Sequence, residues 1–426
     1  MAFTPKYNLV EELKWRGLFH QDMPGVEELL NKEMVSGYVG FDPTADSLHI
    51  GNMVPIILLV HLQKSGHKPI ALVGGATGMV GDPSGKKAER SLLDIETINH
   101  NLACQKAQLE QFLDFNAEEN SAEVVNNYDW FKNFGFLEFI RDVGKHISVN
   151  YMMAKDSVKN RLEDGMSFTE FSYQLVQGYD FYHLWSEKNV KLQMGGSDQW
   201  GNIVTGTELI RRKGQGEAFA ITAPLITKAD GSKFGKSEGG NVWLDAERTS
   251  PFEFYQFWLQ VTDEDAERYI KIFTLHDKEF IDDLINTHRD APHQRALQRE
   301  LATYVTTWVH GQEACEKAIA ASEILFGKAT ADSLKQLSEK DFLSVFEGVA
   351  QAEVDEVEGV NIVDLLADTG FISSKSEAKR DLKGSAIAVN SEKVTEDFVA
   401  SDSDLINGKY LLLQKGKKNK FIVVKK

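Results

Sequence analysis

Cysteine, long apolar runs and a targeting segment are scarce or missing in this chain. Its 426 residues include two cysteines, too few for a disulfide framework or for a zinc site of the usual ligand sets. No apolar run approaches the roughly 20 residues that span a bilayer. The opening MAFTPKYNLVEELKWRGLFHQ lacks the apolar core of a signal peptide and the bias of a transit peptide. We therefore expect a protein of the cytoplasm, a reducing compartment, with no zinc and no membrane partner.

Positive charge is also scarce, except near the C-terminus. The formal net charge of −17 argues at first against a nucleic-acid partner. From Phe371 to the last residue, however, 12 Lys and Arg stand against 7 Asp and Glu, so this part carries +5 and residues 1–370 carry −22. A basic tail on an acidic body indicates a local contact with a polyanion. A solvated charged tail is the alternative.

The periodicity of the first 240 residues is typical of an α/β domain. Strand-like segments such as SGYVGF, KPIALV, SAEVV and VKLQM alternate with helical runs. This alternation predicts a parallel sheet with right-handed crossovers. Between about Asp129 and Val190 the pattern becomes mostly helical and rich in aromatic residues, which predicts a helical insertion in the sheet domain.

The remainder of the chain changes character twice. The pattern is helical from Ser250 to about Gly327, and Ser250-Pro251 suits an N-cap followed by proline at the first helical position. A polar, acidic connector follows, and the last segment predicts two short helices and a β-hairpin. We expect these boundaries: 1–245 for the α/β domain with its insertion at about 129–190, 246–330 for a helical domain, 331–357 for a linker and 358–426 for a small α+β domain.

The first motif that suits a phosphorylated ligand is GFDPTADSLHIGN, from Gly40 to Asn52. It lies at a strand-to-helix junction, where free N–H groups and the helix dipole attract phosphate. His49 and Asn52 are three residues apart and share a helix face. A structural, hydrogen-bonding histidine is the simpler alternative.

Three further motifs are glycine-rich. GGATGMVGDPSGKKAER supplies a hydroxyl, an acid and cations, although its spacing fits neither G-x-G-x-x-G nor a P-loop. GGSDQWGN follows a strand, at the edge where open parallel sheets bind ligands. KADGSKFGKSEGG has two lysines three residues apart, but Asp230 stands where a P-loop needs glycine. Taken singly, each motif also fits an ordinary surface turn, a core-capping loop or a solvated lysine loop.

Together and in this order, the motifs resemble those of the bacterial-type tyrosyl-tRNA synthetases. The resemblance includes SFTEFSYQLVQGYDF and KFGKS, and SKSEAKRDLKGSAIAVNSEKV resembles an S4-like RNA-binding domain, so that it covers essentially the whole chain. It implies a class I synthetase with a Rossmann-type parallel-sheet catalytic domain, a helical insertion that forms a homodimer interface, an α-helical anticodon-side domain and a small α+β S4-like domain. Such an enzyme activates L-tyrosine with ATP and Mg²⁺ to tyrosyl-adenylate and transfers the tyrosine to the 3′-terminal ribose of tRNA(Tyr).

The resemblance also implies roles for individual residues. Tyr38 and Asp180 should meet the phenolic hydroxyl of tyrosine. The residues implied around tyrosine are Tyr38, Thr77, Asp82, Asn127, Tyr173, Gln177, Asp180 and Gln199. Those implied around ATP are Gly40, Asp42, Thr44, His49, Gly51, Asn52, Gly196, Asp198 and Lys236. The implied catalytic set is Thr44, His49, Asn52, Lys86, Arg90, Lys233, Lys236 and Ser237. RNA contacts are implied for Lys375, Lys379, Arg380, Lys417, Lys418 and Lys420.

One position departs from the family pattern. The first signature usually ends in histidine, whereas this chain has Asn52. The amide nitrogen of asparagine lies nearly as far from Cβ as Nδ1 of histidine, so a hydrogen bond donated from that place is retained, while one that requires Nε2 is lost. Tryptophanyl enzymes tolerate asparagine there, so tryptophan specificity is one alternative, disfavoured by Tyr38 and Asp180. A non-catalytic RNA-binding paralogue is another, disfavoured by His49 and both signature lysines.

Overall fold

Two compact units make up the chain. The computed structural model describes residues 3–84, 93–156, 158–159, 165–232, 234–237, 240–325, 330–416 and 419–426. Unit 1 comprises Met1–Asp245 and Val261–Leu301, and unit 2 comprises Ala246–Gln260 and Ala302–Lys426. Among the described residues, no helix combines the length and the apolar character that a membrane crossing requires.

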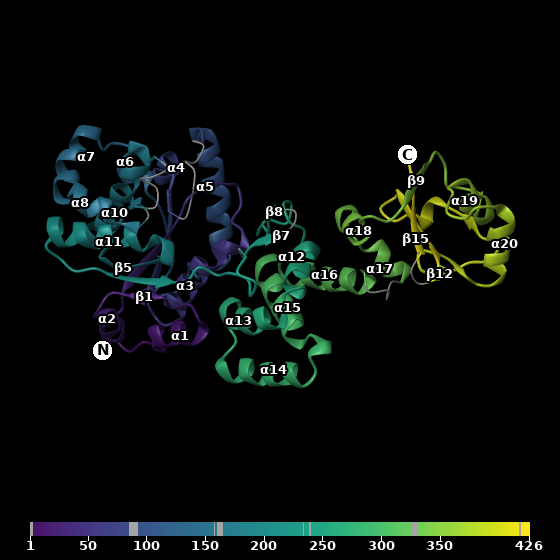
Figure 1. The fold of residues 1–426 in the computed structure, drawn as a ribbon, viewed down its shortest axis with the longest axis horizontal. Helices are drawn as coiled ribbons and strands as arrows, with labels where there is room; N and C mark the ends of the chain where they lie inside the picture. The colour runs from purple at the N-terminus through teal and green to yellow at the C-terminus, as the bar shows by residue number, and fades with distance from the viewer. Residues whose placement is uncertain are drawn as a thin grey trace. The chain divides into compact units, whose positions relative to one another are not determined.

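A six-stranded sheet forms the centre of unit 1 (Figure 1). Its strands are β1 (Gln21–Asp22), β6 (Phe219–Ala223), β5 (Val190–Gly196), β2 (Ser36–Phe41), β3 (Lys68–Val73) and β4 (Glu123–Asn126), in this spatial order. All neighbours are parallel except β1 and β6. The predicted α/β fold class with a parallel sheet is therefore confirmed. Strand β2 pairs with β3 on one side and with β5 on the other, so the strand order reverses its direction at β2. Such a switch point creates a crevice at the carboxyl ends of the strands.

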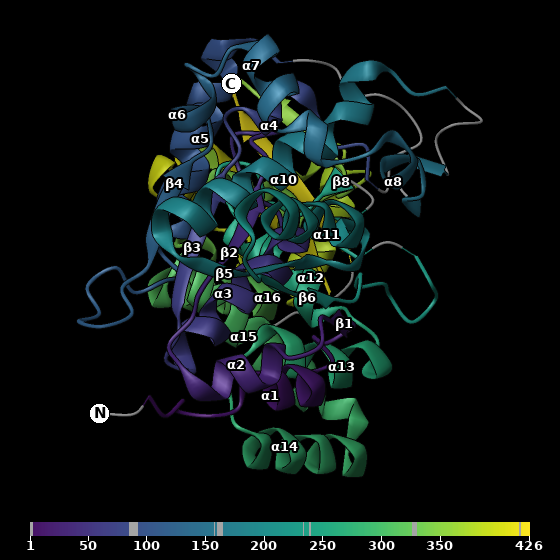
Figure 2. The ribbon, with the colours of Figure 1, turned by 90° about the vertical axis from the view of Figure 1, so that its left-hand side faces the viewer.

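Helices cover this sheet, and most residues of its central strands are buried on both faces. Helix α10 starts with a capping box between Ser167 and Glu170, and it lies beside α11 (Figures 1 and 2). Among the described residues up to position 245, the α-helices are α1 (Leu9–Arg16), α2 (Val26–Lys32), α3 (Met53–Lys64), α4 (Thr77–Val80), α5 (Ile95–Leu109), α6 (Tyr128–Phe131), α7 (Phe136–Asp142), α8 (Val149–Met153), α10 (Phe168–Lys188) and α11 (Trp200–Leu209). The segment predicted as a helical insertion holds α6, α7, α8 and α10.

Unit 1 also contains α13 (Asp263–Phe273) and α14 (Lys278–Asp290). The division of the chain thus runs through the segment 246–330, which the sequence predicts as one helical domain. A buried cation explains why α13 stays with the sheet. Arg16 of α1 donates hydrogen bonds to the carbonyl oxygens of Lys271, Thr274 and His276, at 2.8, 2.7 and 2.7 Å.

Unit 2 joins helices to a second sheet. Its described helices are α12 (Pro251–Leu259), α15 (Ala296–His310, which begins in unit 1), α16 (Gln312–Leu325), α17 (Ala331–Lys335), α18 (Glu339–Val345), α19 (Ile362–Asp368) and α20 (Lys375–Lys383). Its five-stranded sheet has the order β12 (Glu392–Lys393), β11 (Ile387–Val389), β14 (Tyr410–Lys415), β15 (Asn419–Lys425) and β9 (Gln351–Val354). The predicted N-cap at Ser250 and the predicted C-terminal hairpin are confirmed. The segment 331–357, predicted as a linker, carries α17, α18 and β9, which pairs with β15.

Candidate active site

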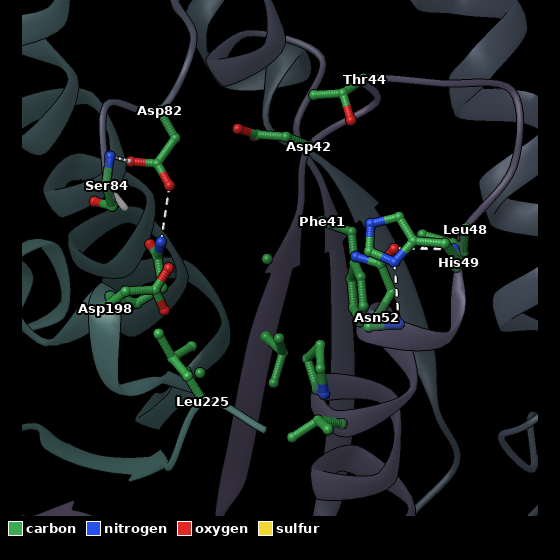
Figure 3. A pocket seen from close by; sticks show the side chains of 18 of the residues that line it. Phe41, Asp42, Thr44, Leu48, His49, Asn52, Asp82, Ser84, Asp198 and Leu225 are labelled. Atoms are coloured by element: carbon green, nitrogen blue, oxygen red, sulfur yellow. Dashed lines mark hydrogen bonds between the residues drawn. The ribbon is translucent and has the colours of Figure 1, made fainter. Parts of the chain in front are cut away.

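A cavity of about 970 Å³ opens at the carboxyl ends of β2 and β5, within unit 1. Figure 3 shows Asp82, Ser84 and Asp198 on one side of it and His49 and Asn52 on the other. Most of the implied tyrosine and ATP residues line this single cavity: Tyr38, Gly40, Asp42, Thr44, His49, Gly51, Asn52, Thr77, Asp82, Tyr173, Gln177, Asp180, Gly196, Asp198 and Gln199. They come from segments as far apart as Tyr38 and Gln199, which the tertiary fold brings together.

The first signature forms a short capped turn between β2 and α3. The backbone N–H of His49 donates to Oδ1 of Asn52 at 3.0 Å, and the N–H of Gly51 donates to Nδ1 of His49 at 3.0 Å (Figure 3). Because Nδ1 accepts, a neutral His49 carries its proton on Nε2. Because Oδ1 of Asn52 accepts, the amide of Asn52 retains donor hydrogens on Nδ2. Any Cβ at Gly51 would lie 2.7 Å from the His49 ring, so this arrangement requires glycine.

Two buried polar side chains line the end of the cavity that lies nearest the sheet. Tyr38 from β2 is 1% exposed, and its hydroxyl has no hydrogen-bond partner among the described residues. Asp180 from α10, also 1% exposed, accepts hydrogen bonds from Nδ2 of Asn127 at 3.0 Å and Nε1 of Trp130 at 2.9 Å. Buried hydroxyls are nearly always bonded in proteins. The lone hydroxyl of Tyr38 therefore points to a ligand with a polar group at this depth.

Burial changes the titration of this end of the cavity. It raises the pKa of Asp180 to about 8, although the hydrogen bonds from Asn127 and Trp130 act in the opposite direction. Burial and the nearby Asp180 also raise the pKa of Tyr38 well above its usual value, so the phenol stays protonated. Strongly shifted groups in a cavity are typical of functional sites.

A second polar group lies closer to the cavity mouth. Nε2 of Gln199 donates to Oδ2 of Asp82 at 2.8 Å, and the backbone N–H of Ser84 donates to Oδ1 at 3.0 Å (Figure 3). The hydroxyl of Tyr173 donates to Oδ2 of Asp42 at 3.0 Å. These contacts hold the carboxylates of Asp82 and Asp42 in place in the cavity lining.

The charge of the described lining is one-sided. It includes Asp42, Asp82 and Asp198 but no lysine or arginine, and the raised pKa of Asp180 leaves that fourth carboxyl mostly protonated at neutral pH. Burial and the nearby Asp82 raise the pKa of Asp198, as expected when carboxylates gather. Such a lining suits a bound ammonium group, whereas a polyphosphate would need cations from other segments.

The expected cations fall mostly outside the structural description. Lys86, Arg90, Lys233, Lys417 and Lys418 lie outside the described residues. For Lys236 and Ser237 the backbone is described, as strand β7 (Lys236–Ser237), which pairs with β8 (Gly240–Asn241). The backbone after this hairpin reaches the first signature, because Val242 accepts a hydrogen bond from the N–H of Ile50 at 2.9 Å and donates one to the carbonyl of Gly235 at 3.1 Å.

Asn127 lies behind the cavity wall and does not line the cavity. It is fully buried, and besides Asp180 it donates to Oγ1 of Thr77 at 3.1 Å and accepts from the N–H of Ala76 at 2.7 Å. Its contacts therefore support the wall that Thr77 and Asp180 present.

Three residues near the site went unnoticed in the sequence. Trp130 binds Asp180, Gln105 donates to the carbonyl of Ala45 at 3.0 Å, and the ring of Trp243 lies edge-on to that of His49 at 5.9 Å. None belongs to a glycine-rich motif. The signal that could have found Trp130 is its place three residues after Asn127 at the end of a strand.

Outside unit 1, helix α20 presents the implied RNA residues. Lys375, Lys379 and Arg380 are exposed. Lys375 forms an ion pair with Asp364 at 2.7 Å. Lys420 lies on β15 with its ammonium 5.1 Å from the centroid of the Phe346 ring, and burial lowers its pKa.

Comparisons with known proteins agree over both units. The profile of the family described as "tRNA synthetases class I (W and Y)" matches residues 30–327, and that of the "Tyrosine--tRNA ligase SYY-like C-terminal domain" matches residues 341–423. A tyrosine–tRNA ligase of Flavobacterium johnsoniae is 63% identical over 98% of this chain and 99% of its own length. One from Bacteroides thetaiotaomicron is 60% identical over 98% and 100%. Among solved structures, a C-terminally truncated mitochondrial tyrosyl-tRNA synthetase of Aspergillus nidulans is 31% identical, with a TM-score of 0.68, and the match covers 75% of this chain and 95% of that one.

Proposed function

The chain belongs to the tyrosine–tRNA ligases, a family of class I tRNA synthetases, and from this membership we propose which residues carry its reaction. The enzyme activates L-tyrosine with ATP, which gives tyrosyl-adenylate and pyrophosphate. It then transfers the tyrosine to the 3′-terminal ribose of tRNA(Tyr).

The observation that carries the assignment of the tyrosine end is the unpartnered hydroxyl of Tyr38 beside Asp180. A phenolic hydroxyl placed between them can accept from one and donate to the other. Phenylalanine would leave the buried Tyr38 hydroxyl without a partner, at a cost of about 1–3 kcal/mol, while Asp180 would keep only its bonds from Asn127 and Trp130. The indole N–H of tryptophan can donate to Asp180 but cannot accept from Tyr38, so tyrosine satisfies both groups whereas tryptophan leaves the Tyr38 hydroxyl without a partner.

The acidic lining near the mouth binds the ammonium group of the substrate. Asp82, oriented by Gln199, supplies the charge, and Tyr173 and Gln177 from α10 complete this wall. Gln177 has a buried side-chain oxygen with no partner among the described residues, and that oxygen can accept from the ammonium group.

ATP binds at the first signature. Nε2 of His49 and Nδ2 of Asn52 supply donors for phosphate oxygens, together with the hydroxyl of Thr44. Gly196 is needed beside the nucleotide because a Cβ there would lie 2.6 Å from a carboxylate oxygen of Asp198. Asn52 thus provides a donor where the family usually has histidine.

The activation step needs positioning and charge stabilisation. The carboxylate of tyrosine is an anion at neutral pH and attacks the α-phosphorus directly, so no general base is required. Negative charge then grows on the α-phosphate and the departing pyrophosphate, and preorganised donors stabilise it. We assign this role to His49 and Asn52 and to the cations Lys86, Arg90, Lys233 and Lys236, with Ser237 beside them.

Mg²⁺ belongs to this proposal as the counter-ion that enters with ATP. Among the described residues there is no group of three or more His, Cys, Asp or Glu side chains that could hold a metal ion. When bound to the phosphates, the ion supplies further positive charge to the leaving pyrophosphate.

Helix α20 is proposed as an RNA contact because its exposed face carries Lys375, Lys379 and Arg380. Reversing charge with Lys379→Glu and Arg380→Glu should raise the tRNA concentration needed for charging and flatten its salt dependence. Tyrosine-dependent ATP–pyrophosphate exchange should not change. Lys393→Glu, at an exposed site of the same unit, is the control. If the double variant aminoacylated tRNA as well as the wild type, the basic residues of this helix would be solvated surface charges and not RNA contacts.

The helical insertion is proposed as a homodimer interface. It exposes large apolar side chains, including Phe136 at 64%, Leu137 at 80% and Phe168 at 66%, and exposed apolar clusters mark interaction sites. Phe168→Asp should shift the sedimentation coefficient from that of a dimer to that of a monomer. An unchanged coefficient would exclude this surface as the dimer interface.

The two cysteines, Cys104 and Cys315, are free, which supports a cytoplasmic enzyme.

The experiment that tests the function as a whole is ATP–pyrophosphate exchange with each of the twenty amino acids. Exchange should depend on tyrosine alone. Exchange with tryptophan would establish the neighbouring specificity, and no exchange with any amino acid would favour the non-catalytic paralogue.

A further inference from the structure

Helix α13 holds the segment that leads into the KFGKS signature. Oδ1 of Asp265 accepts a hydrogen bond from the backbone N–H of Ala229 at 3.0 Å, and the hydroxyl of Tyr269 donates to the carbonyl of Thr227 at 3.1 Å. Further along, the ring of Phe234 lies 5.1 Å from the ring of Tyr269 and 5.1 Å from that of Phe273. One helix therefore contacts this segment before and inside the signature.

The helix itself is fixed at both ends. Thr262 caps its N-terminus by accepting from the N–H of Asp265 at 3.1 Å. At the other end the guanidinium of Arg16, only 3% exposed, binds three carbonyl oxygens. A cation at the carboxyl end also suits the helix dipole. The contacts of α13 thus provide a rigid support.

The same helix supports the first signature. It packs against α3, which follows directly after Asn52. The two signatures also meet each other, because a Cβ at Gly235 would lie 3.3 Å from the side chain of Ile50. A support common to both sides of the ATP site can set their relative position.

We propose that Asp265 and Tyr269 are positioning residues for the activation step, since they fix the backbone that presents the signature lysines to ATP. This inference rests on the proposed function. Neither residue touches the reacting groups. Their hydrogen bonds hold the backbone at Thr227 and Ala229, which leads into the signature, in the geometry that the reaction requires, and small errors of position in an active site lower rates strongly. Burial and the neighbouring Asp265 raise the pKa of Tyr269, so its hydroxyl remains a donor at all working pH values.

The test compares Tyr269→Phe, Asp265→Ala and Asp265→Asn in the full-length enzyme. Tyr269→Phe keeps the ring that packs on Phe234 and removes one hydrogen bond, so single-turnover formation of tyrosyl-adenylate should slow by roughly 3- to 10-fold. Asp265→Ala should slow it at least as much. Asp265→Asn retains an oxygen acceptor for the N–H of Ala229 and should recover most of the wild-type rate.

Two further measurements distinguish the proposed positioning role from a purely structural role. Tyrosine affinity by equilibrium titration should stay near wild type in all three variants, because the tyrosine end of the cavity is untouched, and the thermal midpoint should stay near wild type in Asp265→Asn, which keeps the acceptor. Glu264→Ala removes an exposed carboxylate of the same helical turn, and Tyr7→Phe removes a hydroxyl bonded to His61 elsewhere in unit 1. Both control variants should form adenylate at the wild-type rate.

Wild-type adenylate rates in Tyr269→Phe and Asp265→Ala would overturn the inference. So would a parallel fall of rate, tyrosine affinity and thermal midpoint, or an Asp265→Asn enzyme as slow as Asp265→Ala. A wild-type enzyme that fails to exchange pyrophosphate with tyrosine would instead count against the proposed function.

Discussion

The two ends of the cavity are built in opposite ways. At the tyrosine end, Asp180 is buried, bonded to Asn127 and Trp130, and faces one unpartnered hydroxyl. At the nucleotide end, the contacts come from a capped turn at His49 and from backbone segments that bond to one another. A rigid, desolvated end suits recognition of a fixed shape, whereas an end made of turns suits a ligand whose charge changes during the reaction. Substitutions at the two ends should therefore affect different steps.

The largest effect is expected at the nucleotide end. Lys236→Ala should slow adenylate formation by about 10²- to 10³-fold, because a charge contact to the transition state is lost. Tyrosine affinity should barely change. Single-turnover kinetics measure the rate and a titration measures the tyrosine affinity. An equal loss of rate and of tyrosine affinity would contradict the separate roles of the two ends.

At the tyrosine end, Asp180→Ala should weaken tyrosine binding by roughly 10- to 100-fold, since the phenolic hydroxyl of the substrate would be buried without its acceptor, at a cost of about 1–3 kcal/mol. Discrimination against phenylalanine should fall with it. The matched variant Tyr38→Phe should also weaken tyrosine binding, yet it removes a buried hydroxyl without a partner and should not destabilise the free enzyme. If Asp180→Ala kept the wild-type ratio of exchange rates with tyrosine and phenylalanine, Asp180 would not read the hydroxyl.

A smaller effect is expected for Asn52→Ala, about 10-fold on adenylate formation, because one neutral donor and the bond to the His49 backbone are lost. Asn52→His restores the residue usual in the family and should remain within a few-fold of wild type. Adenylate formation by Asn52→Ala at the full rate would mean that Asn52 acts only as a capping residue.

The last effect concerns stability and leaves the reaction rates aside. The pKa of Asp180 is raised to about 8 in the folded protein and is close to 3.9 in an unfolded chain. Between these values the folded state holds a proton that the unfolded state has released, so the free energy of unfolding should fall as pH rises from about 4 to 8, by at most about 1.4 kcal/mol per pH unit. Asp180→Asn should remove this slope in urea unfolding followed at several pH values. An identical slope in the variant would assign it to other groups.

Much of the nucleotide end was visible in the sequence. His49 and Asn52 lie in one short motif directly after a strand, and parallel strands present their carboxyl ends at the same edge of a sheet. Strands β2 to β5 were predictable because each is a compact apolar run. Strands β1 and β6 were missed, since β1 has only two residues and β6 no neighbouring motif.

The supports of the tyrosine end were not visible in the same way. Trp130 went unnoticed because Asp180 comes to it from 50 positions along the chain, and Asn127, which the family resemblance implied, could not be placed behind the cavity wall without the structure. The place of α13 in unit 1 depends likewise on Arg16, which binds carbonyls more than 250 positions along the chain. Such contacts arise from tertiary packing, and a single sequence carries no local pattern for them.

The most direct test of the division between the two ends is a crystal structure of the enzyme with a stable analogue of tyrosyl-adenylate. The phenolic oxygen should lie within hydrogen-bond distance of both Tyr38 and Asp180, and the phosphate group should lie beside His49 and Asn52. A phenolic oxygen bound elsewhere, with neither Tyr38 nor Asp180 in contact with the ligand, would contradict the account.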